Sequence, residues 1–295
     1  MMINSDPGNG AISNPAIGDY QDILPCVLPF FHIYGLTATL ISKLAYGCKI
    51  IALPKFTPEL YMGTLEKHAA TVLYLVPPIS KKFRILKFIF PLNFWFLLVI
   101  FLTHFDKVTE KHVESVKFVC SGAAPIGGSD AERFLKKTPH VKFIQGYGLT
   151  ESSPVVLMTN SDSRNFASVG SPPPDTEVKI VRLNDENYQG IGPNESGELL
   201  VRGPQIMLGY HNNEKATKET ITPDGWLRTG DIGYYDENQT FYITDRLKEL
   251  IKVKGYQVPP AELEEILRSH PAVVDAAVIG IPDRISGELP RAYVV

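Results

Sequence analysis

The sequence predicts an α/β protein: a large N-terminal domain with mostly parallel sheets and a β subdomain, then a small α+β C-terminal domain. From residue 22 to 148, short apolar runs alternate with longer segments of helix-forming residues. After about residue 165, short apolar runs bounded by glycine-containing turns replace that alternation. Alternating strands and helices are typical of a largely parallel sheet, whereas closely spaced strands with turn signals indicate antiparallel structure.

The elements of the first part follow from their residue patterns. Gly47 is a stop signal for the helix expected before it, and Thr57 is a suitable N-cap for the next helix. The run KIIAL reads as a buried strand because it is entirely apolar after its lysine. The expected strands are 22–30, 49–53, 71–76, 116–122 and 141–148, and the expected helices are 33–47, 57–69 and 129–137.

The later elements predict a β-rich segment and then a smaller domain. DENQ is a plausible hairpin connection within 233–245, because Asp and Asn favour turns. The helix expected at 259–269 begins with prolines, where a missing N–H is harmless. We place the boundary between Asp245 and Arg246, giving domains 1–245 and 246–295. The other strands expected here are 176–183, 197–203 and 273–281.

Composition excludes several classes. The 295 residues are 44% hydrophobic and 21% charged, which is globular composition. A net charge of −3 gives no indication of nucleic-acid binding. Cys26, Cys48 and Cys120 have no metal-ligand spacing, and their odd number argues against a disulfide framework. The N-terminus does not resemble a signal peptide, and RAYVV is not a peroxisomal tripeptide. A reducing compartment is the simpler interpretation.

The most apolar segment, FIFPLNFWFLLVIFLTH, covers 88–104. It is shorter than the roughly 20 residues of a membrane-spanning helix and contains Pro91 and Asn93. A buried helix is therefore favoured over a span. The preceding basic stretch KKFRILK keeps membrane contact through this segment open as the alternative.

The stretch QGYGLTESS, 145–153, carries the first indication of chemistry. Its glycines free the backbone for a close approach to a ligand. Its adjacent Thr and Glu offer two oxygen ligands for a phosphate-bound magnesium ion. A second glycine-containing stretch, SGAAP at 121–125, also follows an expected strand. Because ligands of such sheets bind beyond the carboxyl ends of strands, both stretches are expected at one crevice.

Six segments in a fixed order resemble the adenylate-forming acyl-CoA synthetases, and in particular the 4-coumarate–CoA ligases and the beetle-luciferase-like acyl-CoA synthetases. Enzymes of this family activate a carboxylic acid with MgATP to an acyl-adenylate and pyrophosphate, and then transfer the acyl group to coenzyme A. The resemblance implies ATP, Mg²⁺ and CoA as cofactors or substrates, and an aromatic or fatty acid as the carboxylic acid partner. The six segments are SGAAP, QGYGLTESS, VGSPPPDTEVKIV, GELLVRGPQIMLGY, GWLRTGDIGYYDENQTFYITDR and KELIKVKGYQVPPAELE.

The resemblance implies a nucleotide site in the first part of the chain. Tyr147 would lie against the adenine, Thr150 would bind the α-phosphate, and Glu151 would be the metal ligand. Thr150 and Glu151 are thus two of the expected catalytic residues. The backbone that would approach the adenine comes from Gly122, Ala123, Gly146 and Gly148.

Further roles follow from the resemblance in the later part. Asp231 would accept hydrogen bonds from the ribose hydroxyls, and Arg246 would help to fix the same sugar. Asp245 matches a hinge about which the C-terminal domain rotates between the two half-reactions. Lys252, the third expected catalytic residue, would lie near the adenylate. Gly255 would let the pantetheine of CoA pass the backbone.

Each residue also has an ordinary structural interpretation. Tyr147 could be a core aromatic at the end of a strand, and Thr150 could be the N-cap of a helix. Asp231 could form a turn beside its glycine, and Arg246 could belong to a solvated charged face. His32 could be a core histidine, whereas the resemblance implies that it lines the acyl pocket.

Three departures from the family qualify the expectation. The family's Ser/Thr/Gly-rich phosphate loop should precede LPFFHIYGL, and its catalytic lysine should follow RAYVV; this sequence contains neither. Residues 80–105 fit the family poorly, and our hypothesis for them is an aberrant splice product or a misassembled gene model. The chain therefore resembles a fragment of an ATP-dependent acid–CoA ligase. The alternatives are a luciferase-like monooxygenase and a non-catalytic nucleotide-binding fragment. The expected compartment is peroxisomal or cytoplasmic.

Overall fold

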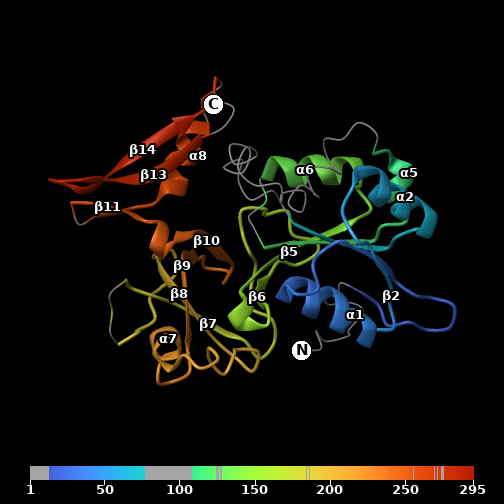
Figure 1. The fold of residues 1–295 in the computed structure, drawn as a ribbon, viewed down its shortest axis with the longest axis horizontal. Coiled ribbons are helices and arrows are strands. Elements are labelled where there is room, and N and C mark those ends of the chain that lie inside the picture. The colour runs from blue at the N-terminus through green and yellow to red at the C-terminus, as the bar shows by residue number, and fades with distance from the viewer. Residues whose placement is uncertain are drawn as a thin grey trace. The chain divides into compact units, whose positions relative to one another are not determined.

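The computed structural model describes residues 13–76, 108–123, 126, 128–183, 185, 187–254, 256–268, 270, 272–273 and 276–295. The chain forms two compact units. The first comprises Met1–Thr176 with Gly203–Gly209, and the second comprises Glu177–Arg202 with Tyr210–Val295. The predicted α/β fold class is confirmed (Figure 1). The boundary at Asp245–Arg246, which separates the main domain from the C-terminal domain expected to rotate, stays a prediction.

The first unit is built on a four-stranded sheet of order β3-β4-β5-β6. Strands β3 (Val72–Leu75), β4 (Phe118–Gly122) and β5 (Lys142–Gly148) are parallel. The edge strand β6 (Val155–Met158) returns antiparallel to β5. A parallel pair, β1 (Ile23–Cys26) and β2 (Lys49–Ala52), lies beside it, and Ile23 and Thr71 exchange hydrogen bonds at the start of β1 and β3.

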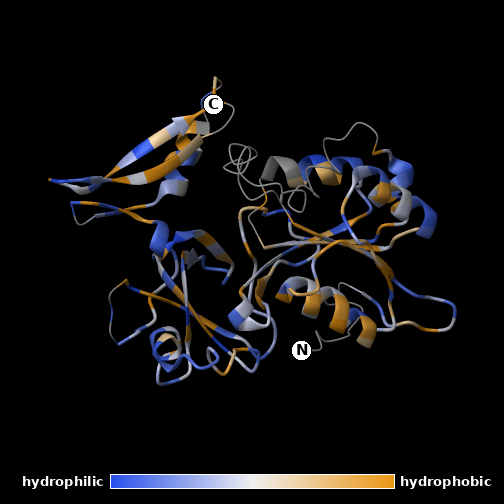
Figure 2. Cartoon of the chain, in the orientation of Figure 1, coloured by the Kyte–Doolittle hydropathy of each residue, from blue (hydrophilic) through white to orange (hydrophobic). Residues whose placement is uncertain are grey.

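Helices cover both faces of this sheet (Figure 1). Helices α2 (Pro58–His68), α5 (Glu110–Val113) and α6 (Gly128–Lys137) pack on one face. The π-helical turns η1 (Tyr34–Ile41), continued by α1 (Ser42–Ala45), pack on the other. Successive side chains of β3 alternate between the two cores, as the period of a strand requires. Figure 2 shows the central strands of this sheet in the hydrophobic colours.

Two predictions about elements of this unit have different outcomes. Thr57 caps α2 as expected, because its hydroxyl accepts a hydrogen bond from the backbone N–H of Leu60 at 3.2 Å. The expectation that 49–53 is a buried strand is wrong in its burial. Lys49 and Ala52 are exposed, and Ile50 is only half-buried, because β2 is the outer member of a two-stranded pair.

The second unit begins with an antiparallel sheet of order β10-β9-β8-β7. Its core includes Trp226, whose ring lies under the Lys179 ammonium at 4.3 Å and the Arg202 guanidinium at 4.5 Å. The predicted hairpin is confirmed, since DENQ connects β9 to β10. The elements are β7 (Glu177–Val181), β8 (Gly197–Arg202), α7 (Glu214–Thr220), β9 (Leu227–Tyr235) and β10 (Phe241–Arg246).

The end of the chain forms a second sheet of order β12-β11-β14-β13 in the same unit. Helix α8 (Pro260–Arg268) is fixed to this sheet by Glu264, whose Oε1 accepts a hydrogen bond from Val278 N at 2.8 Å. The predicted helix 259–269 and a strand within 273–281 are confirmed. The remaining elements are η4 (Leu247–Glu249), β11 (Ile251–Val253), β12 (Tyr256–Val258), β13 (Ala276–Asp283) and β14 (Gly287–Val294).

The predictions for the apolar segment 88–104 and for 80–105 fall outside the described residues. Among the helices that the structure describes, none has both the length and the hydropathy to cross a membrane. Cys26, Cys48 and Cys120 are buried free thiols. No cluster of three or more His, Cys, Asp or Glu side chains suited to a metal ion occurs in the described ranges.

Candidate functional site

The two glycine-containing motifs of the first unit lie on adjacent strands. Gly122, at the end of β4, stands opposite Gly146 of β5. A Cβ atom on Gly122 would come within 3.3 Å of the Gly146 carbonyl oxygen and 3.4 Å of Cζ of Tyr34. A Cβ atom on Gly146 would meet no described residue within 4 Å. Ala123 follows with φ of 70°, so the backbone turns sharply out of β4.

The turn after β5 explains Gly148 by the chain's own packing. A Cβ atom there would lie 1.7 Å from the carbonyl oxygen of Pro154. That oxygen accepts hydrogen bonds from Leu149 N at 3.0 Å and from the buried Ser152 hydroxyl at 2.6 Å. Gly148 is therefore required by this turn, whereas Gly146 faces open space among the described residues and leaves room for a ligand.

Thr150 and Glu151 lie on that turn, in the 3-10 segment η3 (Thr150–Ser152). The N-cap interpretation of Thr150 is wrong, because Leu149 is the N-cap and Thr150 is the first residue of the segment. Thr150 is exposed and Glu151 is half-buried, and the Glu151 carbonyl accepts a hydrogen bond from Met207 N at 2.8 Å. Tyr147 is half-buried rather than a core aromatic. The turn thus carries a hydroxyl and a carboxylate next to the open Gly146.

The side chain of Tyr34, in η1, packs in the same core cluster as Cys120 and holds the end of β4. Its buried hydroxyl donates to the carbonyl oxygen of Cys120 at 3.1 Å and lies 3.4 Å from that of Leu75. Burial, reinforced by Cys120 and Tyr74, raises the pKa of the Tyr34 phenol well above its ordinary value, so it stays a donor. Tyr34 therefore holds the strand directly before Gly122.

Ser121 is a polar group of this site that the motif reading did not single out. It is 1% exposed, and its hydroxyl has no hydrogen-bond partner among the described residues. The only sequence signal is its place directly before Gly122 at the end of an apolar run. A buried hydroxyl without a partner is unusual in a folded protein and marks the end of β4 as a place for a bound polar group.

His32 does not have the buried environment of a core histidine. Its side chain is exposed, and its Nδ1 accepts a hydrogen bond from Tyr34 N at 3.2 Å. The interpretation as a core histidine is wrong. The role of His32 in an acyl pocket stays a prediction.

In the second unit, Asp231 and Arg246 are cross-strand neighbours on β9 and β10. Asp231 is 3% exposed, and its Oδ1 lies 3.1 Å from Nε of Arg246, whose side chain remains 55% exposed. The turn interpretation of Asp231 is wrong, because the residue belongs to a strand. Arg246 is not a solvated charge without a partner. The structure brings these two predicted ribose-binding residues together.

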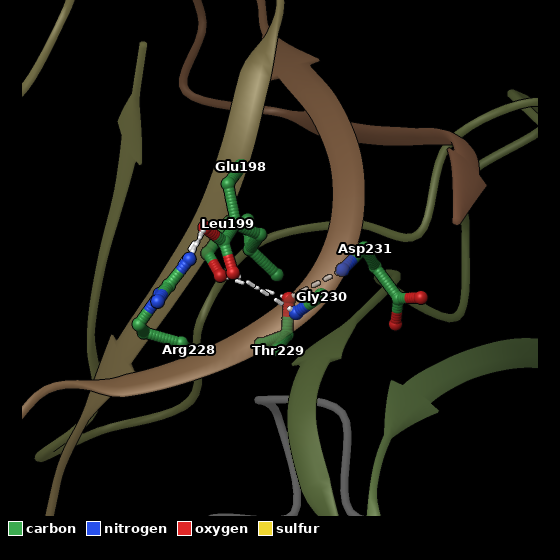
Figure 3. Close-up of polar contacts among 6 residues, drawn as sticks. All are labelled: Glu198, Leu199, Arg228, Thr229, Gly230 and Asp231. Atoms are coloured by element: carbon green, nitrogen blue, oxygen red, sulfur yellow. Dashed lines mark hydrogen bonds and ion pairs between the residues drawn. The ribbon is translucent and has the colours of Figure 1, made fainter. Parts of the chain in front are cut away.

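A set of hydrogen bonds from Glu198 and Thr229 holds the backbone just before Asp231, and the sequence motifs did not reveal it (Figure 3). Glu198 of β8 is 4% exposed and contacts Arg228 and the backbone of Gly230. The Thr229 hydroxyl accepts a hydrogen bond from Asp231 N at 3.0 Å. The available signal in the sequence was an acidic residue inside the apolar run GELLV. A carboxylate buried in such a run needs a polar partner.

The predicted hinge and CoA-side residues lie in the same unit. Asp245 is buried, and its Oδ1 accepts a hydrogen bond from Arg246 N at 2.7 Å. Lys252 is exposed on β11, where its backbone N donates to Glu288 Oε2 at 2.7 Å. Gly255 lies outside the described residues. The roles of Asp245, Lys252 and Gly255 stay predictions.

Comparison with known proteins agrees with the resemblance. A family model described as AMP-binding enzyme matches residues 8–211, and a model for the C-terminal domain of these enzymes matches residues 262–295. "Probable CoA ligase CCL5" of Humulus lupulus is 44% identical over 280 residues, which are 94% of this chain and 47% of that protein. "Peroxisomal OPC-8:0-CoA ligase 1" of Arabidopsis thaliana is 44% identical over 92% of this chain and 46% of that protein.

A solved structure extends the likeness to three dimensions. The o-succinylbenzoate CoA synthetase of Bacillus subtilis, in complex with its acyl-adenylate intermediate, matches with a TM-score of 0.75 and 30% identity. The match covers 94% of this chain and 51% of that one. The chain thus spans about half the length of the relatives it matches. With the family model covering more than half of the chain and the glycine motifs in their expected order, the chain belongs to the AMP-binding enzyme family.

Proposed function

We propose that this chain serves ATP-dependent acid–CoA ligation, in which a carboxylate is adenylated by ATP and the acyl group then passes to CoA. The observation that carries the proposal is the open space at Gly146 beside the turn that holds Thr150 and Glu151. A nucleotide base can approach backbone that lacks a Cβ atom, and the neighbouring oxygens then lie close to the phosphates. The CoA ligases among the relatives favour ligation over the monooxygenase alternative.

In the adenylation step, Tyr147 offers its half-buried ring as a face for the adenine. The Thr150 hydroxyl donates to the α-phosphate, and the Glu151 carboxylate would hold the Mg²⁺ ion that accompanies the nucleotide. One carboxylate suits this ion, because Mg²⁺ usually keeps several waters and binds through one or two carboxylates plus substrate phosphates. The bound ion supplies charge neutralisation. These residues orient the α-phosphorus for attack by the carboxylate oxygen.

Asp231 and Arg246 hold the ribose of the same nucleotide in this proposal. Carboxylate oxygens accept hydrogen bonds, so Asp231 suits the sugar hydroxyls as donors. Nε of Arg246 lies 3.1 Å from Oδ1 of Asp231, and this ion pair limits the rotation of the buried Asp231 side chain. Each hydrogen bond to a charged group is worth roughly 1.5–3 kcal/mol.

For thioester formation, we assign Lys252 to the adenylate and Gly255 to the passage of the pantetheine chain. His32 lines the acyl pocket, and Asp245 is the hinge. The carboxylic acid is an aromatic or fatty acid. The peroxisomal or cytoplasmic location stays a prediction, since a peroxisomal name belongs to one relative only.

The experiment measures ATP binding to the chain by calorimetry with Mg²⁺ and with EDTA, for the wild type and for Glu151→Gln. We expect Mg²⁺ to tighten binding for the wild type and to have little effect for Glu151→Gln, because the neutral amide is a poor ligand for a hard cation. Glu195→Gln, which alters an exposed ion pair with Arg182 in the other unit, is the control and should respond to Mg²⁺ as the wild type does.

Pyrophosphate release with a panel of acids is then compared between this chain and a chimera that supplies the remaining parts of the Humulus lupulus relative. Release by the chimera, lost in Glu151→Gln, supports ligation. Absence of ATP binding and of release in both proteins contradicts the proposal. ATP binding by the chain with release by the chimera alone shows that the chain by itself is a nucleotide-binding fragment.

A further inference from the structure

Glu198 is a buried carboxylate that uses both of its oxygens to hold one short stretch of β9 (Figure 3). Its Oε2 accepts hydrogen bonds from Arg228 Nη2 at 3.0 Å and from Arg228 Nε at 3.4 Å. Its Oε1 accepts one from the backbone N–H of Gly230 at 3.2 Å. The Glu198 side chain is 6% exposed, so these bonds stand in for most of the water that a free carboxylate would bind.

The stretch that Glu198 holds is a bulge. In the pairing of β8 with β9, Glu198 stands opposite Ile232 and Leu200 stands opposite Arg228, so that Thr229–Asp231 face Leu199 alone. Gly230 has φ of 69°, in the left-handed region that favours glycine. Bulges interrupt the regular hydrogen bonds of a sheet, redirect a side chain, and are over-represented next to active sites.

Within the bulge, side chains provide hydrogen bonds in place of the interrupted backbone pairs between β8 and β9. The Thr229 hydroxyl donates to the Leu199 carbonyl at 2.8 Å and accepts from Asp231 N at 3.0 Å. Glu198 takes the N–H of Gly230 between them. Since buried backbone N–H groups require partners, the bulge depends on these two side chains for its conformation.

Arg228 is the positively charged partner of the buried Glu198 carboxylate. Its guanidinium is held between Glu198 and the ring of Tyr188, which lies 5.6 Å away. Burial alone would lower the pKa of Arg228, but the hydrogen bond and the charge of Glu198 raise the pKa above its ordinary value. An ion pair in this setting contributes little to net stability compared with an apolar pair, so its main effect is on geometry.

We propose that Glu198 is a positioning residue for nucleotide recognition: through Gly230 and Arg228 it fixes the bulge that presents the Asp231 carboxylate to the ribose. This rests on the proposed function, in which Asp231 reads the sugar. Glu198 does not touch the nucleotide. It acts on the backbone that precedes Asp231 and thereby on the Asp231–Arg246 pair.

The first test needs no nucleotide. The double variant Glu198→Leu/Arg228→Met removes the buried pair without leaving an unpaired charge, which protects the fold. We expect hydrogen exchange of the Gly230 and Asp231 amides to be at least tenfold faster, and the Arg246 Nε–H NMR resonance to move toward its value in an unpaired arginine. Glu198→Gln keeps an oxygen for Gly230 N and should restore slow exchange at Gly230 in part. The matched control, Glu177→Leu/Arg202→Met, removes an exposed pair of the same sheet and should leave these signals unchanged.

The second test compares the Kd of ATP with that of 2′,3′-dideoxy-ATP. We expect the wild type to prefer ATP and Asp231→Asn to lose that preference. Glu198→Leu/Arg228→Met should reduce the preference at least fivefold while changing the Kd of the dideoxy nucleotide less than twofold. A preference retained by Asp231→Asn overturns the ribose assignment, and with it the proposed function of Asp231.

Unchanged amide exchange and an unchanged Arg246 resonance in Glu198→Leu/Arg228→Met overturn the positioning role whatever the nucleotide result. A lost preference in Asp231→Asn with a retained preference in the double variant overturns it as well. If the chain binds neither nucleotide, the proposed function fails and the exchange measurement alone decides whether Glu198 holds Asp231.

Discussion

Gly146 and Gly148 lie two residues apart in one motif and have different surroundings. The backbone turn that carries Thr150 excludes any side chain at Gly148, because the Pro154 carbonyl occupies that space. Among the described residues, no atom lies within 4 Å of a Cβ atom on Gly146, so packing does not explain that glycine. The approach of a ligand to Gly146 stays a proposal.

Alanine substitutions separate the two cases. We expect Gly148→Ala to lower the free energy of unfolding by about 1–3 kcal/mol or more, because the new methyl group overlaps backbone that must move. We expect Gly146→Ala to leave stability within about 0.5 kcal/mol of the wild type while weakening ATP binding. Urea unfolding followed by circular dichroism measures the first effect and calorimetry the second. Equal unfolding midpoints for Gly148→Ala and the wild type would refute the packing explanation.

The thiols of Cys26 and Cys120 make stability depend on alkaline pH. Burial raises the pKa of each thiol from 9.0 to about 11, opposed in part by hydrogen bonds with Thr39 and Tyr34 respectively. Below pH 9 both the folded and the unfolded chains hold these protons. Between pH 9 and 11 the folded chain keeps protons that the unfolded chain has lost, so stability falls as pH rises.

We therefore expect the stability advantage of the wild type over Cys26→Ala/Cys120→Ala to shrink as pH rises from 9 to 11. The full effect is on the order of 2–3 kcal/mol for each thiol, at 1.36 kcal/mol per pKa unit. Subtracting the variant removes the contribution of other alkaline groups, including the buried Tyr34 and Tyr74. Urea unfolding at several pH values measures the difference, and a difference that is constant with pH contradicts the assignment.

At the residue scale, the sequence identified groups by motif but not by environment. Thr150, Glu151 and Asp231 were recognised from their neighbours in the chain. Glu198 and Ser121 were not, because their significance arises from strand register and burial, which a single segment does not reveal. The apolar neighbours of His32 left a core position open beside the predicted acyl-pocket role, and the exposed side chain rules out the core position.

At the scale of elements, helix α2 shows how local signals define a helix. Thr57 is extended, with φ of −132° and ψ of 148°, and caps the helix with its hydroxyl, and Pro58 occupies the first position. Ala69 ends the helix in the left-handed conformation, with φ of 49°. Tyr61 and Leu65, four residues apart, face the core of the first unit.

Removal of the cap tests how much this end contributes. We expect Thr57→Ala to lower the free energy of unfolding by about 1 kcal/mol, because the N–H of Leu60 loses its acceptor. Thr57→Ser keeps the hydroxyl and should retain most of the stability. Chemical denaturation of the three proteins provides the comparison. A loss in Thr57→Ser as large as that in Thr57→Ala would assign the effect to the methyl group and not to the cap.

Elements with a clear period and a clear cap were predictable. Strands β3 and β4 and the Phe143–Ile144 part of β5 are largely buried apolar runs, and α2 has signals at its start. The burial of β2 was not predictable, because an apolar run does not show whether a second layer covers it. The π-helical form of η1 has no signal in the sequence that we used. The bulge in β9 depends on pairing with β8, so the sequence of either strand alone does not reveal it.

At the scale of the whole molecule, the nucleotide-binding proposal draws on both compact units. The glycine-lined strand ends and the Thr150–Glu151 turn belong to the first, and the Asp231–Arg246 pair belongs to the second. The order of motifs along the chain identified the family without reference to their positions in space. The central claim to test is that ATP binding depends on the assigned residues of each unit.

Titration of ATP into this chain, two site variants and one control variant tests that claim most directly. Gly146→Ala alters the first unit, Asp231→Asn alters the second, and Glu177→Gln alters an exposed ion pair of the second as the control. The account predicts that the wild type and the control bind ATP equally. It predicts that each of the two site variants raises the Kd by about tenfold or more, as loss of a hydrogen bond to a charged group or of backbone approach requires. Equal ATP affinity in all four proteins, or an effect confined to one unit, would contradict it.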